Sequence, residues 1–179
     1  MAIPARGGAL PDGDEGDTVA DRAVFKGYAL QGIDGKGRVA LPAPMRLIVE
    51  GQKGERTLLL SDDDKRGCLR AADQNWSDRL YDRLTADAER ALDAGREIDR
   101  EDIAASAFGR FDEVPFDASG RFILPPFLRD KGALTTLAFF WGAGDTIEVW
   151  SPEKLLADPD ADAAKKERCA WLMAERGAS

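Results

Sequence analysis

An internal duplication is the feature that most constrains how this chain can fold. When the chain is shifted by 83 positions, residues 25–46 align with residues 108–129 without a gap. Seven of the 22 aligned pairs are identical, whereas chance supplies about one at ordinary residue frequencies. The identical pairs are Phe25/Phe108, Asp34/Asp117, Gly37/Gly120, Arg38/Arg121, Leu41/Leu124, Pro42/Pro125 and Arg46/Arg129. The chain is therefore expected to contain two related units with the same local structure.

Each repeat reads as a strand, a tight turn, a second strand and a short helix. Residues 25–33 and 110–116 are rich in aromatic and branched side chains, which favour strands. The Asp-x-x-Gly-Arg motif that follows predicts a turn, because aspartate accepts hydrogen bonds from nearby amides and glycine tolerates positive φ. The second strand ends at a proline, where a short helix begins. We expect these helices to end at Gly51 and Gly132.

Further helices are predicted outside the repeats. Residues 75–92 carry apolar side chains at helical spacing and form an amphipathic helix whose apolar stripe is expected in the core. Residues 99–108 form a second helix, with Asp99 as its cap. A third helix starts at Ser151, and residues 161–175 form a fourth. Phe139, Phe140, Trp141 and Trp150 are expected in the core or in a subunit interface. Trp171 is expected to pack within the chain, with docking on a neighbouring chain as the alternative.

Composition excludes a membrane protein and disfavours an enzyme. The longest run without a charged residue has 13 residues, which is short of the roughly 20 that a membrane-spanning helix needs. The N-terminal segment holds five acidic residues and no apolar core, so it is not expected to act as a secretory signal, and we predict a cytoplasmic protein. No histidine is present to act as a base or metal ligand, and Cys68 and Cys169 are expected to be reduced structural thiols. We predict no catalytic residue, metal or cofactor.

The two Asp-x-x-x-Arg turns carry the candidate binding chemistry. Although the net charge is −8, residues 25–60 hold six cations and three acids, so the first repeat is locally basic. Asp34 can hold the guanidinium of Arg38 in a fixed orientation, from which it can bind a phosphate or a guanine edge with two hydrogen bonds. The candidate DNA-binding residues are Arg38, Lys36, Arg46, Arg121 and Arg129; the residues expected to orient the turns are Asp34, Gly37, Asp117 and Gly120.

The first repeat is expected to bind more strongly than the second. Its turn tip carries Lys36, whereas the second turn has Ser119 at the equivalent position. Each repeat supplies few phosphate contacts. We therefore expect a multimer to combine them across tandem sites through effective concentration.

The motifs DGKGR at 34–38 and DASGR at 117–121, each after an aromatic strand and before a proline-started helix, resemble those of the MraZ family. This is a group of bacterial transcriptional regulators built from two AbrB-type swapped-hairpin modules, and the resemblance covers about residues 24–157. It implies an α+β fold in which the two repeats interleave into a pseudo-twofold β-barrel with flanking helices. It also implies a ring-shaped homo-oligomer that binds repeats of double-stranded DNA in the promoter of the division and cell-wall gene cluster and represses it, in the cytoplasm at the nucleoid.

The resemblance divides the chain into five parts. These are a disordered acidic extension at 1–23, the first AbrB-like repeat at 24–72, connecting helices at 73–106, the second repeat at 107–151 and a C-terminal helical tail at 152–179. The acidic extension, the acidic segment within 61–107 and the longer tail depart from the family pattern.

Other interpretations of the same residues stay open. The paired aspartates and arginines can be structural salt bridges, and Arg46 and Arg129 can be solvated or paired with acids of the other half. At the level of function, the chain can be a non-catalytic oligomeric scaffold for protein interactions, which shows no salt-dependent DNA binding. A carboxylate-based enzyme lacks a recognisable constellation of catalytic residues. RNA binding requires exposed aromatic platforms, whereas the aromatic residues here alternate as core residues do.

Overall fold

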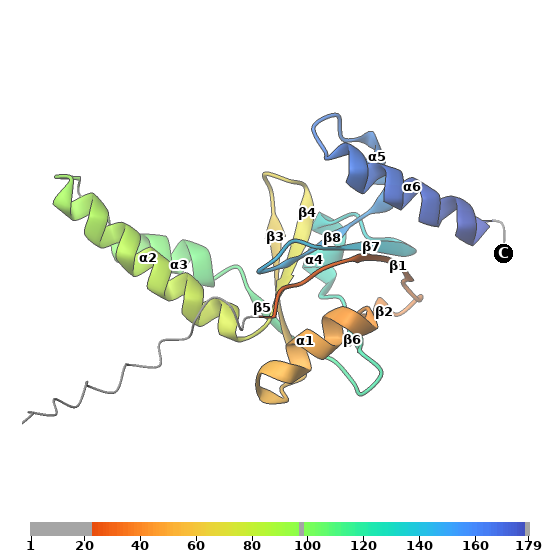
Figure 1. Ribbon diagram of the computed structural model, residues 1–179, viewed down its shortest axis with the longest axis horizontal. Helices are drawn as coiled ribbons and strands as arrows, with labels where there is room; N and C mark the ends of the chain where they lie inside the picture. The colour runs from red at the N-terminus through yellow and green to blue at the C-terminus, as the bar shows by residue number, and fades with distance from the viewer. Residues whose placement is uncertain (1–22, 97–98, 178–179) are drawn as a thin grey trace, which may run out of the picture.

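The computed structural model describes residues 23–96 and 99–177, which form an α+β fold (Figure 1). The strands of the first repeat are β1 (Tyr28–Gly32), β2 (Arg38–Ala40), β3 (Thr57–Asp63) and β4 (Cys68–Ala72). Those of the second are β5 (Asp112–Pro115), β6 (Arg121–Ile123), β7 (Leu137–Gly142) and β8 (Ile147–Trp150). The helices are α1 (Ala43–Lys53), α2 (Asn75–Asp93), α3 (Arg100–Phe108), α4 (Pro126–Lys131), α5 (Pro152–Ala157) and α6 (Ala163–Gly177). The predicted disordered extension lies, up to residue 22, outside the described residues.

The strands of the two repeats interleave. A six-stranded sheet has the order β1-β7-β8-β4-β3-β5, and β2 pairs with β6 in a separate two-stranded ribbon. Every pairing is antiparallel. The pairs β1–β7, β3–β5, β4–β8 and β2–β6 each join one strand from each repeat. Neither repeat can therefore complete its sheet without the other.

The strand register has the symmetry that the duplication implies. Leu30 lies opposite Phe139 on β7, and Glu113, the repeat equivalent of Leu30, lies opposite Leu59 on β3. In the β2–β6 ribbon, Val39 lies opposite Phe122, which is its own repeat equivalent. Exchanging the two repeats leaves this pairing pattern unchanged, so the pseudo-twofold axis passes through the Val39/Phe122 pair.

Both repeats contribute to one main hydrophobic core. Its members include Val39, Leu41, Met45, Leu58, Leu60, Leu69, Phe122, Leu124, Leu128, Leu134, Phe140, Ile147 and Val149, all of which are buried. Burying a side chain of this size contributes about 1.5–3 kcal/mol. The shared core therefore ties the two halves together energetically as well as topologically.

The two short helices both begin as predicted, but only one of them ends at the predicted glycine. Both follow a proline, and α4 ends at Gly132 as expected. The expected end of α1 at Gly51 is wrong, because the helix continues through Gly51 to Lys53 and stops at Gly54. Gly54 has a φ of 69°, and its amide donates a hydrogen bond to the carbonyl oxygen of Glu50. This left-handed conformation ends the helix, and glycine adopts it at low cost.

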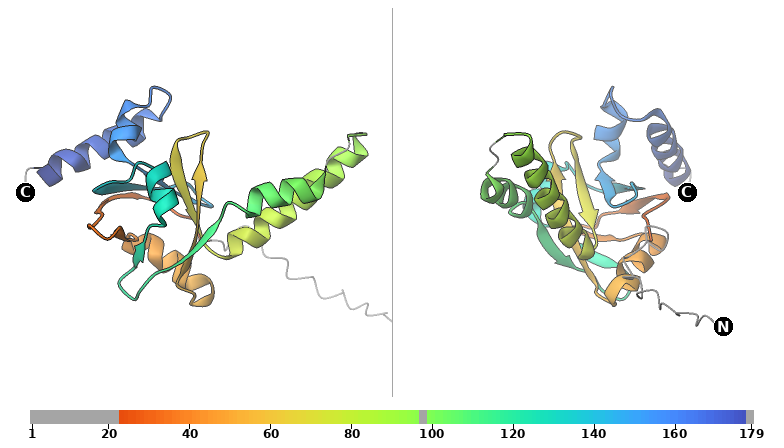
Figure 2. Two further views of the ribbon diagram at one scale, coloured as in Figure 1. Left: turned by 180° about the vertical axis from the view of Figure 1, so that it is seen from behind. Right: turned by 60° about the vertical axis from the view of Figure 1, so that its left-hand side comes forward.

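Helices α2 and α3 form an antiparallel arm that projects away from the sheet (Figures 1 and 2). The carboxylate of Asp99 caps α3 by accepting hydrogen bonds from two amides of its first turn, as predicted. The expectation that the apolar stripe of α2 lies in the core is correct for Trp76 and Ala88, which are buried, while Leu80 and Leu84 are partly buried. Tyr81 and Leu92, beside the stripe, are more than half exposed. The reason is that α2 packs along α3 beyond the edge of the sheet, so part of its apolar face has no partner among the described residues.

Helices α5 and α6 lie at the other end of the molecule from the arm (Figure 1). They pack on the sheet around Phe139, Trp150 and Cys169. Helix α5 starts after Ser151 as predicted, and the Ser151 side chain caps it. The expectation that Trp171 packs within the chain is wrong, since its side chain is 57% exposed. It follows the buried Cys169 by two residues, which is roughly 200° around the helix and places it on the outer face. None of the described helices has the length and apolar content needed to cross a membrane.

Two backbone hydrogen bonds tie the turns of the repeats to each other. The amide of Leu41 donates to the carbonyl oxygen of Gly120 at 2.8 Å, and the amide of Leu124 donates to that of Gly37 at 3.0 Å. Both glycines have positive φ, 78° at Gly37 and 82° at Gly120. A Cβ atom at Gly120 would lie 3.1 Å from the carbonyl oxygen of Leu41, whereas one at Gly37 would meet the flexible side chain of Arg129.

We predict that Gly120→Ala destabilises the protein more than Gly37→Ala. Positive φ costs each alanine about 1–2 kcal/mol, and at Gly120 the backbone oxygen must move as well. Urea unfolding of both variants, with Gly35→Ala as a control that meets no atom within 4 Å, measures the difference. Equal free energies of unfolding for the two variants would contradict the close packing at the second turn.

Candidate nucleic-acid interface

The β2–β6 ribbon presents one buried face and one outer face. Val39 and Phe122 point into the core, and the alternation of a strand places the flanking residues on the other side. Arg38 lies opposite Ile123, and Ala40 lies opposite Arg121. The two arginines are thus diagonal neighbours on one face, where the Cβ atoms of such pairs are about 7–8 Å apart. The outer face consists of Arg38, Ala40, Arg121 and Ile123.

Asp34 organises the first turn. Its Oδ1 accepts hydrogen bonds from the backbone amides of Lys36 and Arg38, each at 2.9 Å. Its Oδ2 accepts a hydrogen bond from Nε of Arg38 at 2.6 Å. Both side chains remain exposed, at 49% for Arg38 and 40% for Asp34. The predicted carboxylate-held guanidinium is therefore present in this repeat.

The orientation of Arg38 leaves its terminal nitrogens available. Asp34 engages only Nε, and within residues 23–96 and 99–177 neither terminal nitrogen makes a hydrogen bond or ion pair. The hydrogen bond from the Arg38 amide, followed by the one from its side chain, lowers the pKa of Asp34 to about 2. The carboxylate is thus charged at any physiological pH.

The second turn has the same backbone and a different side-chain arrangement. Asp117 accepts hydrogen bonds from the hydroxyl and amide of Ser119 and from the amide of Arg121. The hydroxyl of Ser119 is the main reason that the pKa of Asp117 is lowered. In the described part of the chain, no hydrogen bond joins Asp117 to the Arg121 guanidinium. This arginine is exposed and is not held as Arg38 is.

Arg46 bonds to the second turn from α1, while Arg129 on α4 bonds to the segment that follows its own helix and lies close to Gly37. Nη1 of Arg46 donates to the carbonyl oxygen of Ala118 in the opposite repeat at 3.2 Å, while Nε lies 4.0 Å from Glu50. Arg129 donates through Nε and Nη2 to the carbonyl oxygens of Leu134 and Thr135, each at 2.9 Å. Both arginines are partly buried. These contacts favour a structural role. In the described residues the hydrogen-bond acceptors of both arginines are backbone carbonyl oxygens, and neither arginine pairs with an acid of the other half, contrary to one expectation from the sequence.

The sequence interpretation named Lys36 and missed two residues of the outer face. The Lys36 side chain is exposed at the tip of the first turn and has no ion pair among the described residues. Ala40 and Ile123 were not identified, although they follow Arg38 and Arg121 by two positions and so share their face in a strand. That period-two spacing is the signal that could have found them.

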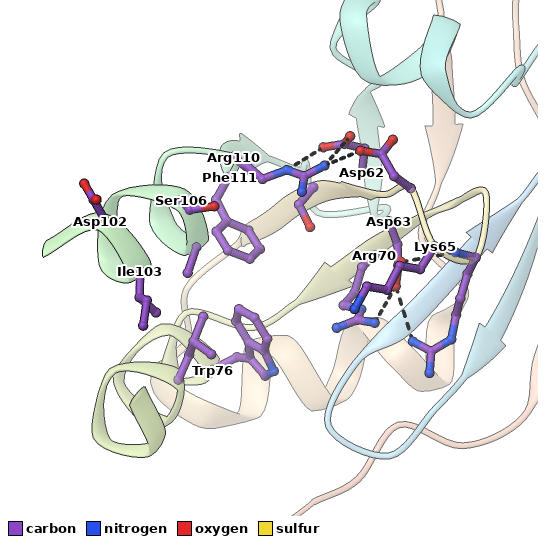
Figure 3. Close-up of a pocket in the computed structure, with 15 residues that line it drawn as sticks. Asp62, Asp63, Lys65, Arg70, Trp76, Asp102, Ile103, Ser106, Arg110 and Phe111 are labelled. Carbon is purple, nitrogen blue, oxygen red and sulfur yellow. Dashed lines mark hydrogen bonds and ion pairs between the residues drawn. The ribbon is translucent and has the colours of Figure 1, made fainter. Parts of the chain in front are cut away.

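A separate cavity lies between the arm and the β3–β4 turn (Figure 3). It has a volume of about 880 Å³, and its charged residues are largely paired with one another. Arg110 bonds to Asp62 at 2.7 Å and to Asp64 at 2.8 Å, and Lys131 also bonds to Asp64. Asp62 and Asp64 are therefore ion-paired. In the described residues, no group of three or more acids or cysteines is placed to hold a metal ion.

Comparison with known proteins places the chain in a family. Three curated relatives carry the name transcriptional regulator MraZ. That of Gluconacetobacter diazotrophicus is 32% identical over 73% of this chain and 80% of its own length. That of Parvibaculum lavamentivorans is 34% identical over 72% and 76%, and that of Ruegeria pomeroyi is 30% identical over 83% and 86%. The chain belongs to the MraZ family of transcriptional regulators. No family model matches it.

Membership of the MraZ family agrees with the resemblance drawn from the two Asp-x-x-x-Arg motifs.

The two cysteines are buried, and burial raises the pKa of Cys68 to about 12 and that of Cys169 to about 11. Both are thus protonated at neutral pH, which disfavours nucleophilic chemistry.

We predict that the Asp34 carboxyl group titrates near pH 2. A carboxyl group with a depressed pKa in the folded state contributes stability that is complete above its ordinary pKa of 3.8 and is lost as the pH falls through about 2. Carboxyl ¹³C NMR measures this pKa directly. In Arg38→Ala it should move only part of the way to 3.8, because the amide of residue 38, the largest cause, remains. A wild-type midpoint at 3.8 would disprove the turn geometry.

We also predict that Arg46→Met and Arg129→Met lower stability. Methionine keeps an apolar stem but removes the hydrogen bonds, each worth about 1 kcal/mol, so Arg129→Met, which loses two, should cost more. Thermal unfolding of both variants measures this. If both keep wild-type stability and lose only DNA affinity, these arginines contact DNA instead of stabilising the fold.

Proposed function

We propose that this protein is a DNA-binding repressor that uses the outer face of the β2–β6 ribbon. The observation that carries the proposal is the pair of exposed arginines, Arg38 and Arg121, placed diagonally on one face by the strand register. They share an accessible surface, which is the arrangement needed for one polyanion to contact both. Lys36 at the adjoining turn tip adds a third cation.

The dimensions and chemistry of the ribbon suit the major groove of DNA. A two-stranded ribbon fits this groove, which is about 12 Å wide. With Nε held by Asp34, the two terminal nitrogens of Arg38 form a fork that matches O6 and N7 of guanine or two phosphate oxygens. We assign the stronger contact to the first repeat. Arg121 lacks this support and loses more conformational entropy on binding.

Arg46 and Arg129 are assigned to positioning in this proposal. Arg46 bonds to the second turn, and Arg129 lies beside Gly37 of the first turn while it bonds to the segment after α4. Their hydrogen bonds to backbone carbonyls leave less of each guanidinium for DNA. Gly37 and Gly120 provide the positive φ of those turns, and Asp34 and Asp117 bind the turn amides.

Assembly accounts for DNA binding by an acidic chain. One ribbon offers few cations against a net charge of −8, so we propose that copies join in a ring and engage tandem promoter repeats together. Linked sites raise overall affinity by roughly 10²–10⁴ without any new contact. In this proposal the repeats are AbrB-type swapped-hairpin modules closing one pseudo-twofold barrel. The target is the division and cell-wall gene cluster, and the protein acts in the cytoplasm at the nucleoid.

A non-catalytic interaction scaffold is the second candidate. The exposed Tyr81, Leu92 and Trp171, on the arm and on α6, favour contacts with other chains. Such a scaffold would show no salt-dependent affinity for DNA, which separates it from the regulator.

We predict that Arg38→Ala weakens binding to the DNA upstream of the protein's own gene by about tenfold or more. Arg121→Ala should weaken binding less, because its guanidinium is not pre-oriented. For the wild type, log affinity should fall linearly with log salt concentration. Fluorescence anisotropy on that fragment measures all three quantities.

Two controls accompany this experiment. Arg90→Ala removes an exposed arginine of the arm that pairs with Asp87, and it should leave affinity unchanged. Circular dichroism and oligomer size should be unaltered in Arg38→Ala. If this variant unfolds, its ion pair with Asp34 is structural; if it binds like the wild type, the ribbon is not the interface.

A further inference from the structure

Ile123 is an unexpected residue for the outer face of the ribbon. Its side chain is 58% exposed although it lies in a strand directly opposite Arg38. The repeat equivalent of Ile123 is Ala40, which lies opposite Arg121. The outer face is thus a two-by-two array in which each arginine faces an apolar residue. The two halves differ by the size of that residue.

The array constrains what can cover Ile123. An isoleucine flanked by arginines disfavours a purely apolar partner, because docking one would strip water from the guanidinium groups. A partner with negative charge and small apolar groups at a matching spacing satisfies both. The major groove of DNA has this composition, since phosphates border a floor on which each thymine carries a 5-methyl group.

The restricted conformation of Ile123 also favours contact with a thymine methyl group. Ile123 is branched at Cβ, so its χ1 angle is restricted. Its strand neighbour Phe122 is fully packed in the core and holds the backbone in place. The methyl groups of Ile123 are therefore presented at a defined position across the ribbon from Arg38, with little entropy to lose on contact.

We propose that Ile123 is a specificity-determining residue that packs on the 5-methyl group of a thymine next to the base pair or phosphate bound by Arg38. This inference rests on the proposed DNA-binding function. Ala40 offers a single methyl group at the symmetry-related position, so the two half-sites of the operator are read unequally. The stronger thymine requirement then lies on the side of each promoter repeat that Ile123 contacts.

The test uses DNA in which uracil replaces thymine. The fragment upstream of the gene is amplified with either dTTP or dUTP, which removes every 5-methyl group and keeps all base-pairing groups. Wild-type protein should bind the thymine form about fourfold more tightly for each methyl group that it contacts. Ile123→Ala should bind the thymine form more weakly and lose most of this preference, whereas Ile123→Val should retain it.

Matched variants separate the possible outcomes. Leu47→Ala, which removes an exposed leucine of α1, and Arg38→Ala should both keep the thymine preference, the latter at lower overall affinity. An unchanged thymine-to-uracil ratio in Ile123→Ala overturns the inference while leaving DNA binding intact. A change in oligomer size in Ile123→Ala with that ratio unchanged identifies Ile123 as a chain-to-chain contact. If wild type binds neither fragment better than an unrelated duplex, the proposed function itself fails.

Discussion

The structure depends on the exchange of backbone hydrogen bonds between the two turns across the β2–β6 ribbon. The amides of Leu41 and Leu124 each bond to the glycine carbonyl of the opposite turn, and the Val39/Phe122 pair between them lies on the pseudo-twofold axis. The ion pair between Asp34 and Arg38 forms within one turn, whereas the placement of Arg38 diagonally across from Arg121 requires both repeats. The packing of the core and the arrangement of the candidate interface therefore both depend on the pairing of the two repeats.

The arginines of this chain fall into two groups that differ in their surroundings. Arg38 is exposed and held at Nε by one carboxylate, which leaves its fork open. Arg46 and Arg129 are partly buried and bonded to backbone carbonyls, while Arg110 is neutralised by two aspartates. The exposed cations of the ribbon thus differ from the other arginines described above, which are bonded to backbone carbonyls or to aspartates. This local arrangement matters more for binding a polyanion than the net charge does.

Local features were predictable wherever neighbouring residues determine them. Asp99 and Ser151 cap their helices, and Gly132 ends α4, because each depends on hydrogen bonds within one turn of chain. The end of α1 was misplaced although it is set locally, because Gly51 and Gly54 are both glycines that can end a helix and the chain adopts the left-handed conformation at Gly54. Prediction otherwise failed where distant packing decides, as for the outward-facing Trp171. The sequence also left the role of Arg46 open, since the carbonyl that it contacts lies 72 residues away.

The sequence by itself determined that there are two equivalent turns, each with an aspartate, a positive-φ glycine and an arginine at matched positions. These features follow from residue type and spacing over a few residues. The sequence also determined family membership, through motifs that recur in matched frames. Only the tertiary structure decided that the two turns pair with each other, that Arg38 and Arg121 become diagonal neighbours, and that Ile123 joins them. Strand pairing between segments 83 residues apart is set by the shared core, which no local pattern encodes.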